Sequence, residues 1–251
     1  MTNKLNQFTI HNSLLSVKAI AFTLAETLIV MGIIGVVAAL TLPNLNSSTG
    51  DKEKVAKVKK IYSNLEDAMG RAQAVYGPID EWFQKDTTAT AQATRFGSRI
   101  TEFLKVSKDC DVTTNGNCFT TGIVKYYSFT DNTADNFNTS NAYYKVILAD
   151  GTSVAFGNVV PGEDYSIMFD IDGPNKGSYT LGRDVFIFTY YENTSDFERD
   201  YINVSECIDT GFSCVQWILE YGNMDYLKVD SNGKCPDGKT ILDGTTNTTC
   251  K

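Results

Sequence analysis

The stretch Phe22–Leu42, FTLAETLIVMGIIGVVAALTL, decides the fold, because it is largely apolar and carries a single charge, at Glu26. A helix over these residues is about 31 Å long at 1.5 Å per residue, close to the thickness of a bilayer core. We therefore expect residues 22–42 to span a membrane. The preceding leader, residues 1–21, contains two lysines and no acidic residue. An ordinary membrane anchor is the plain alternative, whereas a secretory signal peptide would carry its cleavage pattern after the apolar region.

The segment Ala21-Phe22-Thr23-Leu24-Ala25-Glu26, followed by an apolar helix, resembles the processing site of type IV pilins and type II secretion pseudopilins. The resemblance covers residues 18–45 closely, and only the general layout after them. It implies that a prepilin peptidase cuts between Ala21 and Phe22 and that the new amino terminus at Phe22 is N-methylated. It also implies that Glu26 serves filament assembly. Most members of the family have Gly before the cut, where this chain has Ala21.

The physical chemistry of Glu26 agrees with an assembly role. An ionised carboxylate within an apolar membrane span costs a few kcal/mol unless it finds a partner. Cleavage would create an ammonium group at Phe22, one helical turn away or on a neighbouring subunit. Such a pair would offset the cost and fix the axial offset between subunits. The alternative is that Glu26 only reaches the headgroups, because it lies near the end of the helix.

Composition and charge indicate how the rest of the chain is organised and on which side of the membrane it lies. The 251 residues, 42% of them hydrophobic, can hold one membrane helix and one globular domain. From residue 76 onward there are 14 Lys/Arg and 25 Asp/Glu, a net charge of −11. This acidity argues against nonspecific binding of nucleic acid. Lysines in the leader predict a cytoplasmic amino terminus, a single pass through the inner (cytoplasmic) membrane and a domain outside the cytoplasm.

The helix is expected to continue beyond Pro43, which would kink it. After the polar break at residues 44–50, apolar residues recur every three or four positions up to Tyr76 and predict one buried helical face. Two helices joined by a linker are the alternative. We therefore divide the chain into a cleaved leader (1–21), a long helix (22–76) and an exported globular domain (77–251). The predicted buried face consists of Val55, Val58, Ile61, Tyr62, Leu65, Ala68, Met69, Ala72 and Val75.

The remaining pattern predicts an α+β domain, in which the long helix packs on an antiparallel sheet as in pilins. A helix is expected around residues 98–108. Asp150-Gly151 between two aromatic and β-branched runs is a hairpin signal. The expected strands are 123–129, 143–149, 152–156, 165–170, 184–190 and 215–221.

The loop from Asp170 to Asp184 contains the turn sequence Asp172-Gly-Pro-Asn175. Similar loops recur in pseudopilin-like sequences, some of which bind calcium. The side-chain oxygens of Asp170, Asp172, Asn175 and Asp184 suit Ca²⁺, although the loop lacks the spacing and terminal Glu of an EF-hand. A plain structural turn explains the same residues, because Gly, Pro and Asn are turn residues.

Six cysteines lie in the predicted exported part, an even number that predicts disulfides formed in an oxidising compartment. Six cysteines allow 15 connectivities, which the sequence does not separate. Nearest-neighbour pairing is our prediction, because each bond would close a short loop. Zinc is the alternative, but there is no Cys-x-x-Cys and the single His lies in the leader. The predicted pairs are Cys110–Cys118, Cys207–Cys214 and Cys235–Cys250.

Motifs for catalysis are missing from the sequence. The single histidine, His11, lies in the leader, so the cleaved chain has no Ser-His-Asp or Cys-His device. There is no phosphate loop or nucleotide fingerprint. Scattered carboxylates would allow a glycosidase pair, but an acidic surface contains such pairs by chance. We expect no enzymatic activity and no resident cofactor other than the calcium considered above.

The expected function is a structural subunit, bulk or minor, of a type IV pilus or type II secretion pseudopilus that lies at the cell surface or in the periplasm. The partners implied by the resemblance are related subunits, the prepilin peptidase, a membrane platform protein and, through it, a cytoplasmic assembly ATPase. The alternative is a singly anchored, exported binding or adhesin domain that does not polymerise.

Overall fold

The computed structural model describes residues 23–82, 88–119, 124–125, 134–135, 139–157, 165–191, 196–197 and 203–250. Within these ranges, the side chains of residues 38–49, 125, 134–135, 191 and 196–197 are not described. The chain divides into two compact units, Met1–Ser47 and Ser48–Lys251. Each unit is described by itself.

One long helix, α1 (Leu24–Tyr76, 53 residues), occupies the region where a long helix was predicted, so the alternative of two separate helices is wrong. The prediction of a membrane-spanning first half over residues 22–42 is corrected. No helix in the described part of the chain is long and apolar enough to cross a membrane.

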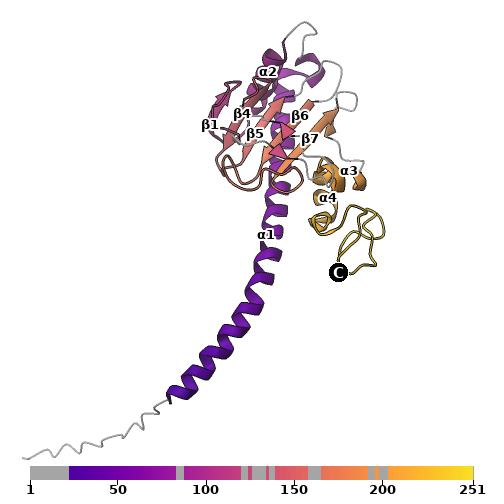
Figure 1. Ribbon diagram of the computed structural model, residues 1–251. Helices are drawn as coiled ribbons and strands as arrows, with labels where there is room; N and C mark the ends of the chain where they lie inside the picture. Colours follow the sequence, from indigo (N-terminus) through magenta and orange to yellow (C-terminus); the bar gives the residue numbers. More distant parts are fainter. Residues whose placement is uncertain are drawn as a thin grey trace, which may run out of the picture. The chain divides into compact units, whose positions relative to one another are not determined.

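The second unit contains a six-stranded antiparallel sheet, in the spatial order β1-β4-β5-β6-β7-β8 (Figure 1). The central strands β4 to β7 are sequential neighbours in the sheet, and they fall in the aromatic and β-branched runs that predicted strands. The predicted hairpin at Asp150-Gly151 is confirmed: Gly151 has φ +91°, and Ile147 pairs with Ser153 across it. The six strands are β1 (Val106–Asp111), β4 (Tyr143–Leu148), β5 (Ser153–Gly157), β6 (Tyr165–Asp170), β7 (Val185–Tyr191) and β8 (Asp196–Phe197).

The main core lies between the sheet and two helices, the second half of α1 and α2 (Ala89–Thr101). Tyr62 of α1 packs against Phe188 of β7 with ring centroids 5.1 Å apart, and Phe96 of α2 packs against Phe156 at 5.9 Å. The face predicted for α1 is therefore largely confirmed, since its residues from Val58 to Ala72 are buried. Val75 is the exception, because 64% of it is exposed.

The helix predicted over residues 98–108 is misplaced. Helix α2 begins earlier, after the cap residue Thr88, whose side chain accepts a hydrogen bond from the Ala91 N–H. It ends at Thr101, because Val106 already pairs with Leu148 at the start of β1. The amphipathic pattern continues into that strand, and the sequence alone did not reveal the boundary.

The strand predicted over residues 215–221 is wrong, since Cys214–Tyr221 forms helix α4. Residues Val215 to Ile218 are all buried, and a fully buried apolar run has no periodicity that separates a strand from a helix. Within the strand predicted over residues 123–129, the described residues form β2 (Val124–Lys125), which pairs with β3 (Ala134–Asp135). Residues 123 and 126–129 lie outside the described residues.

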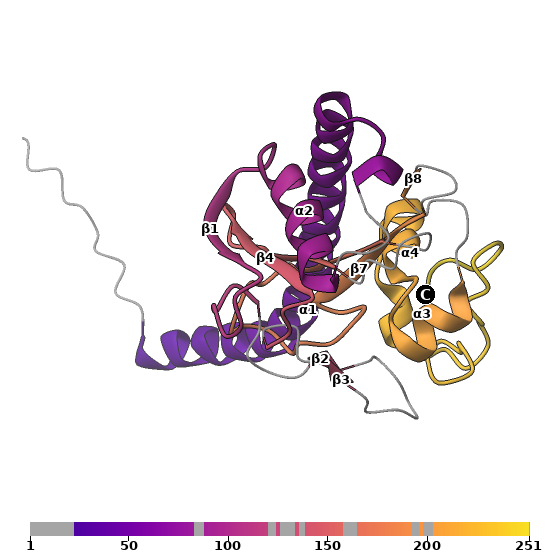
Figure 2. The ribbon, with the colours of Figure 1, turned by 90° about the horizontal axis from the view of Figure 1, so that it is seen from above.

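The C-terminal part packs near the β7 edge of the sheet. It consists of α3 (Val204–Thr210), α4, the 3-10 helix η2 (Asp225–Lys228) and a turn-rich tail. Figures 1 and 2 both show α3, α4 and the tail near one edge of the sheet and β1 at the other. A smaller apolar cluster around Phe119 and Met168 completes the domain, and a further 3-10 helix, η1 (Ile79–Trp82), follows α1.

Candidate functional site

The start of α1 places Thr23 and Glu26 in a reciprocal capping arrangement. The Thr23 N–H and hydroxyl donate hydrogen bonds to Glu26 Oε2 at 2.9 and 2.8 Å, and the Glu26 N–H donates to Thr23 Oγ1 at 3.2 Å. This is a capping box, in which a carboxylate at the third helical position satisfies a free N–H at the helix start. These hydrogen bonds lower the pKa of Glu26. The predicted cleavage residues, Ala21 and Phe22, lie outside the described residues.

Residues 24–37 present apolar side chains on every side of the helix, and all of these residues are exposed. Leu24 is 78% exposed and Met31 is 73% exposed, values that are unusual for large apolar residues. A helix that is apolar all round belongs in the interior of a larger structure. The exposed set is Leu24, Leu28, Ile29, Val30, Met31, Ile33, Ile34, Val36 and Val37.

The acidic loop between β6 and β7 is organised by Asp184, a buried residue that directly precedes β7. Its carboxylate accepts hydrogen bonds from the backbone N–H groups of Ser178, Tyr179 and Thr180 and from the Ser178 hydroxyl. The Tyr179 and Thr180 bonds measure 3.0 and 2.6 Å. A Cβ at Gly177, which has φ +77°, would overlap Asp184 Oδ2. Asp184 therefore shapes the loop through the loop's own donors.

Asp170 has a different environment at the end of β6. It is fully buried; its Oδ1 accepts hydrogen bonds from the Asp172 and Gly173 N–H groups at 3.0 and 3.2 Å. Its Oδ2 has no hydrogen-bond partner among the described residues. The pKa of Asp170 is raised to about 8, mainly by burial and also by the nearby charges of Asp184 and Asp172, although the hydrogen bonds from the Asp172 and Gly173 N–H groups act in the opposite direction.

The residues predicted to bind calcium lie at the two ends of this loop and within it. No group of three His, Cys, Asp or Glu residues in the described part of the chain could hold a metal ion. The oxygens of Asp184 accept four hydrogen bonds from the loop. Asn175 lies in the same turn with φ +65°, as expected of a turn residue. Calcium binding by Asp170, Asp172, Asn175 and Asp184 stays an untested prediction.

The predicted cysteine pairing is confirmed by three disulfides in the structure: Cys110–Cys118, Cys207–Cys214 and Cys235–Cys250. The described residues contain no free cysteine. Disulfides are typical of proteins that fold in an oxidising compartment.

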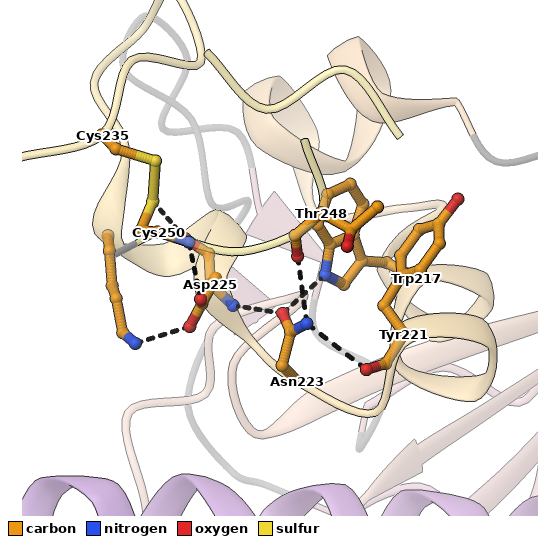
Figure 3. A network of polar contacts seen from close by, with 8 residues as sticks. Trp217, Tyr221, Asn223, Asp225, Cys235, Thr248 and Cys250 are labelled. Atoms are coloured by element: carbon orange, nitrogen blue, oxygen red, sulfur yellow. Dashed lines mark hydrogen bonds and ion pairs between the residues drawn. A yellow bond between two sulfur atoms is a disulfide. The ribbon is translucent and has the colours of Figure 1, made fainter. Parts of the chain in front are cut away.

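The third disulfide belongs to a polar network that holds the end of the chain (Figure 3). The Cys250 N–H donates to Asp225 Oδ2 at 2.8 Å, and Lys228 Nζ donates to Asp225 Oδ1 at 2.5 Å. Asn223 links α4 to the tail, because its Oδ1 accepts a hydrogen bond from Trp217 Nε1 at 2.9 Å and its Nδ2 donates to the Thr248 carbonyl at 3.0 Å. The tail is thus held rigidly beside α4.

A groove that the sequence did not reveal lies between α1 and the β4–β5 hairpin. We call it the hairpin groove. Its volume is about 490 Å³. Two ion pairs lie along it, Lys60–Asp150 at 2.8 Å and Arg71–Asp67 at 3.2 Å. It is lined by Lys60, Asn64, Asp67 and Arg71 of α1, by Phe103, Leu104 and Lys105 between α2 and β1, and by Leu148, Ala149 and Asp150 of the hairpin.

Comparison with known proteins gives one match. A family model described as "Family of unknown function (DUF6613)" matches residues 45–241, which is more than half of the chain. No curated protein and no solved structure matches the chain.

Proposed function

The chain belongs to the DUF6613 family, whose description assigns no activity, and we propose that the chain is a structural subunit of a filament of the type IV pilin or pseudopilin class. In this proposal a prepilin peptidase removes residues 1–21 and exposes Phe22 for N-methylation. The apolar residues 24–37 of neighbouring copies then pack side by side. The disulfide-bonded domain lies outside the cytoplasm and plays a structural rather than a catalytic part.

The exposed apolar segment of α1 is the observation that supports this proposal. Nine large apolar side chains between Leu24 and Val37 are more than half exposed. Burying one such side chain stabilises a structure by about 1.5–3 kcal/mol, so nine would contribute at most about 14–27 kcal/mol before costs. Association itself costs about 4–15 kcal/mol. Because the apolar residues surround the helix, neighbours on several sides are needed to cover them, as in a bundle of parallel copies.

In this proposal Glu26 fixes the axial offset between neighbouring helices of the bundle, which we call their register. In the single chain the Glu26 carboxylate caps its own helix through Thr23. Within packed apolar helices an ionised carboxylate is costly unless it is paired with a charge. The ammonium group of a cleaved Phe22 on a neighbouring copy supplies that charge. Assembly would then replace part of the capping box with an ion pair between subunits.

The test combines processing with assembly. The native protein is expected to begin at Phe22 and to carry one added methyl group, as read by mass spectrometry of its amino-terminal peptide. Glu26→Ala is expected to be cleaved normally but to be absent from filaments sheared from cells and viewed by electron microscopy. Glu53→Ala is the matched control, because Glu53 lies on the same helix with its side chain 66% exposed and is expected to assemble normally.

Three results would contradict the proposal or a part of it. A native protein that still begins at Met1 would remove the processing step. Normal incorporation of Glu26→Ala would remove the register role. A cleaved protein that stays monomeric, with or without the substitution, would favour an exported binding or adhesin domain that does not polymerise.

A further inference from the structure

The hairpin groove combines an apolar floor with a charged rim. Phe103 and Leu104 are partly buried, Leu148 is buried, and all three line the groove. Three cations and two acids line it as well, which gives the rim a net charge of +1 in a chain whose net charge is −8. Such a groove suits an apolar side chain that is flanked by charges of both signs, with acids in excess.

The tail of the same chain carries a segment with these properties. Within the described part of residues 48–251, Val75 and Ile241 are the exposed large apolar residues. Ile241 is 51% exposed and lies in the segment Asp237–Asp243, DGKTILD, which we call the tail loop. Asp237, Lys239 and Asp243 are all exposed and give the tail loop a net charge of −1.

The tail loop is held in one conformation by its own hydrogen bonds. Asp237 Oδ1 accepts from the Lys239 and Thr240 N–H groups at 2.8 and 2.9 Å. Asp243 Oδ1 accepts from three consecutive N–H groups after it, which lowers the pKa of Asp243 to about 2 and keeps it charged. Leu242 is buried beneath, and the Cys235–Cys250 disulfide closes the tail. A preformed loop loses little conformational entropy when it binds.

The groove and the tail loop lie towards opposite edges of the sheet. Leu148 of the groove pairs with Val106 of β1, the first edge strand. The tail is attached to α4, which packs against β7 near the other edge, and Figures 1 and 2 agree on this separation. One chain therefore cannot insert its tail loop into its own groove.

We propose that the tail loop of one copy inserts Ile241 into the hairpin groove of a second copy. Lys239 of the loop faces the acids of the rim, Asp67 and Asp150, and the loop's aspartates face the rim cations. This contact is head-to-tail, because two different surfaces meet, and a repeated contact of this kind generates a ring or an open helical filament. The inference deepens the proposed function and rests on it for the repetition of the contact along a filament.

One loop in one groove is a small interface, below the roughly 1,000 Å² expected for a stable complex. It is therefore weak in isolation and gains strength when the helices hold the copies together. For this reason the test uses the full chain, extracted in detergent, with a covalent trap. The photo-crosslinker p-benzoylphenylalanine replaces Ile241 in ¹⁵N-labelled protein, which is mixed with unlabelled wild-type protein and irradiated.

The expected result is a cross-linked dimer whose peptides join labelled position 241 to unlabelled residues 103–105 or 148–150. Asn232, an exposed residue of the same tail, is the control position and should not cross-link to these residues. Lys239→Glu should lower the yield at position 241 at least threefold. Cross-links that map only to other surfaces, or only within one copy, would overturn the proposal.

The same experiment in the Glu26→Ala background separates the two proposals. If the Glu26→Ala chain forms no filaments but position 241 still cross-links to the groove as in the wild-type chain, the loop contact is supported. Glu26 is then the residue that filament formation requires. Normal filaments of Glu26→Ala with cross-linking at position 241 contradict the register role of Glu26 and support the loop contact. Filaments of the wild-type chain without any cross-link from position 241 to the groove overturn the loop contact alone.

Discussion

The free energy of unfolding of this chain should fall as the pH rises from about 4 to about 8, because of one buried carboxyl group. Asp170 is fully buried, and its Oδ2 has no hydrogen-bond partner among the described residues. Burial raises its pKa from 3.8 to about 8. Asp170 is therefore protonated in the folded chain at pH 7 but ionised in the unfolded chain.

The sign and size follow from proton linkage. Between the two pKa values the folded state binds one more proton than the unfolded state, so stability falls by about 1.4 kcal/mol per pH unit. From pH 5 to pH 8 the loss amounts to about 4 kcal/mol. This contribution is complete below pH 4, is lost as the pH rises through the folded pKa, and changes no further above it. Domains of this kind have only about 5–15 kcal/mol of stability, so the effect is measurable.

Asp170→Asn removes the ionisable group and keeps the acceptor, because an amide oxygen can accept the Asp172 and Gly173 N–H groups. At pH 5 the variant should match the wild type to within about 1–2 kcal/mol, the cost of burying an unpaired amide NH₂. At pH 8 it should be the more stable protein by a few kcal/mol. Urea unfolding at five pH values between 5 and 9 measures the difference, with the fluorescence of the buried Trp82 and Trp217 as the signal.

Asp184→Asn is the matched control at the neighbouring buried carboxylate. Loss of the Asp184 charge should weaken the hydrogen bonds with the loop donors and lower stability at every pH. Most of the fall in stability between pH 5 and pH 8 should remain, because burial is the largest cause of the raised pKa of Asp170 and the Asp184 charge is a smaller one. A wild-type protein whose stability does not fall over this range would refute the reasoning. The reasoning would also be refuted if the stability of Asp170→Asn fell with rising pH as steeply as that of the wild type.

Three further substitutions test the packing of the domain by thermal unfolding. Replacing both Cys235 and Cys250 by Ser opens a loop with a sequence separation of 15 and should cost about 3 kcal/mol. Gly177→Ala should lower the free energy of unfolding by about 1–3 kcal/mol, because residue 177 has φ +77° and the new Cβ would displace the Asp184 carboxylate. An unchanged melting temperature of this variant would argue against the hydrogen bonds between the loop and Asp184. Val75→Ser should change stability by less than about 0.5 kcal/mol, since the residue is 64% exposed, and a larger loss would show that Val75 is covered.

The sequence predicted the central hairpins because their signals are local. Asp150-Gly151 specifies a tight turn, and the runs on both sides of it are rich in aromatic and β-branched residues, as strands are. The start of α2 was harder to recognise, because residues 89–95 are mostly Ala, Thr and Gln and show no apolar stripe. Gly97 gives a further reason: it is buried in the helix so that Tyr144 can approach, since a Cβ there would overlap the tyrosine ring. That requirement is tertiary and leaves no local pattern.

The hairpin groove could not be predicted for a similar reason. Its residues come from three segments, around positions 60–71, 103–105 and 148–150, that only the folded topology brings together. Each segment alone resembles an ordinary solvated surface. The tail loop, by contrast, had visible signals, because Asp-x-Asn-Gly and Asp-Gly turns flank a single apolar pair, Ile241-Leu242.

The turn sequence between Asp170 and Asp184 led us to predict a calcium site, which stays an untested prediction. Most of the carboxylates discussed above accept hydrogen bonds from backbone N–H groups of their own chain: Glu26 at the start of α1, Asp184 in the loop, and Asp237 and Asp243 in the tail. Such hydrogen bonds lower the pKa of Glu26, Asp237 and Asp243, since hydrogen bonds to the charged form of a carboxyl group favour it. Asp170 departs from this pattern, because only one of its oxygens is satisfied. The pH dependence of stability should therefore come mainly from that residue rather than from the acidic surface as a whole.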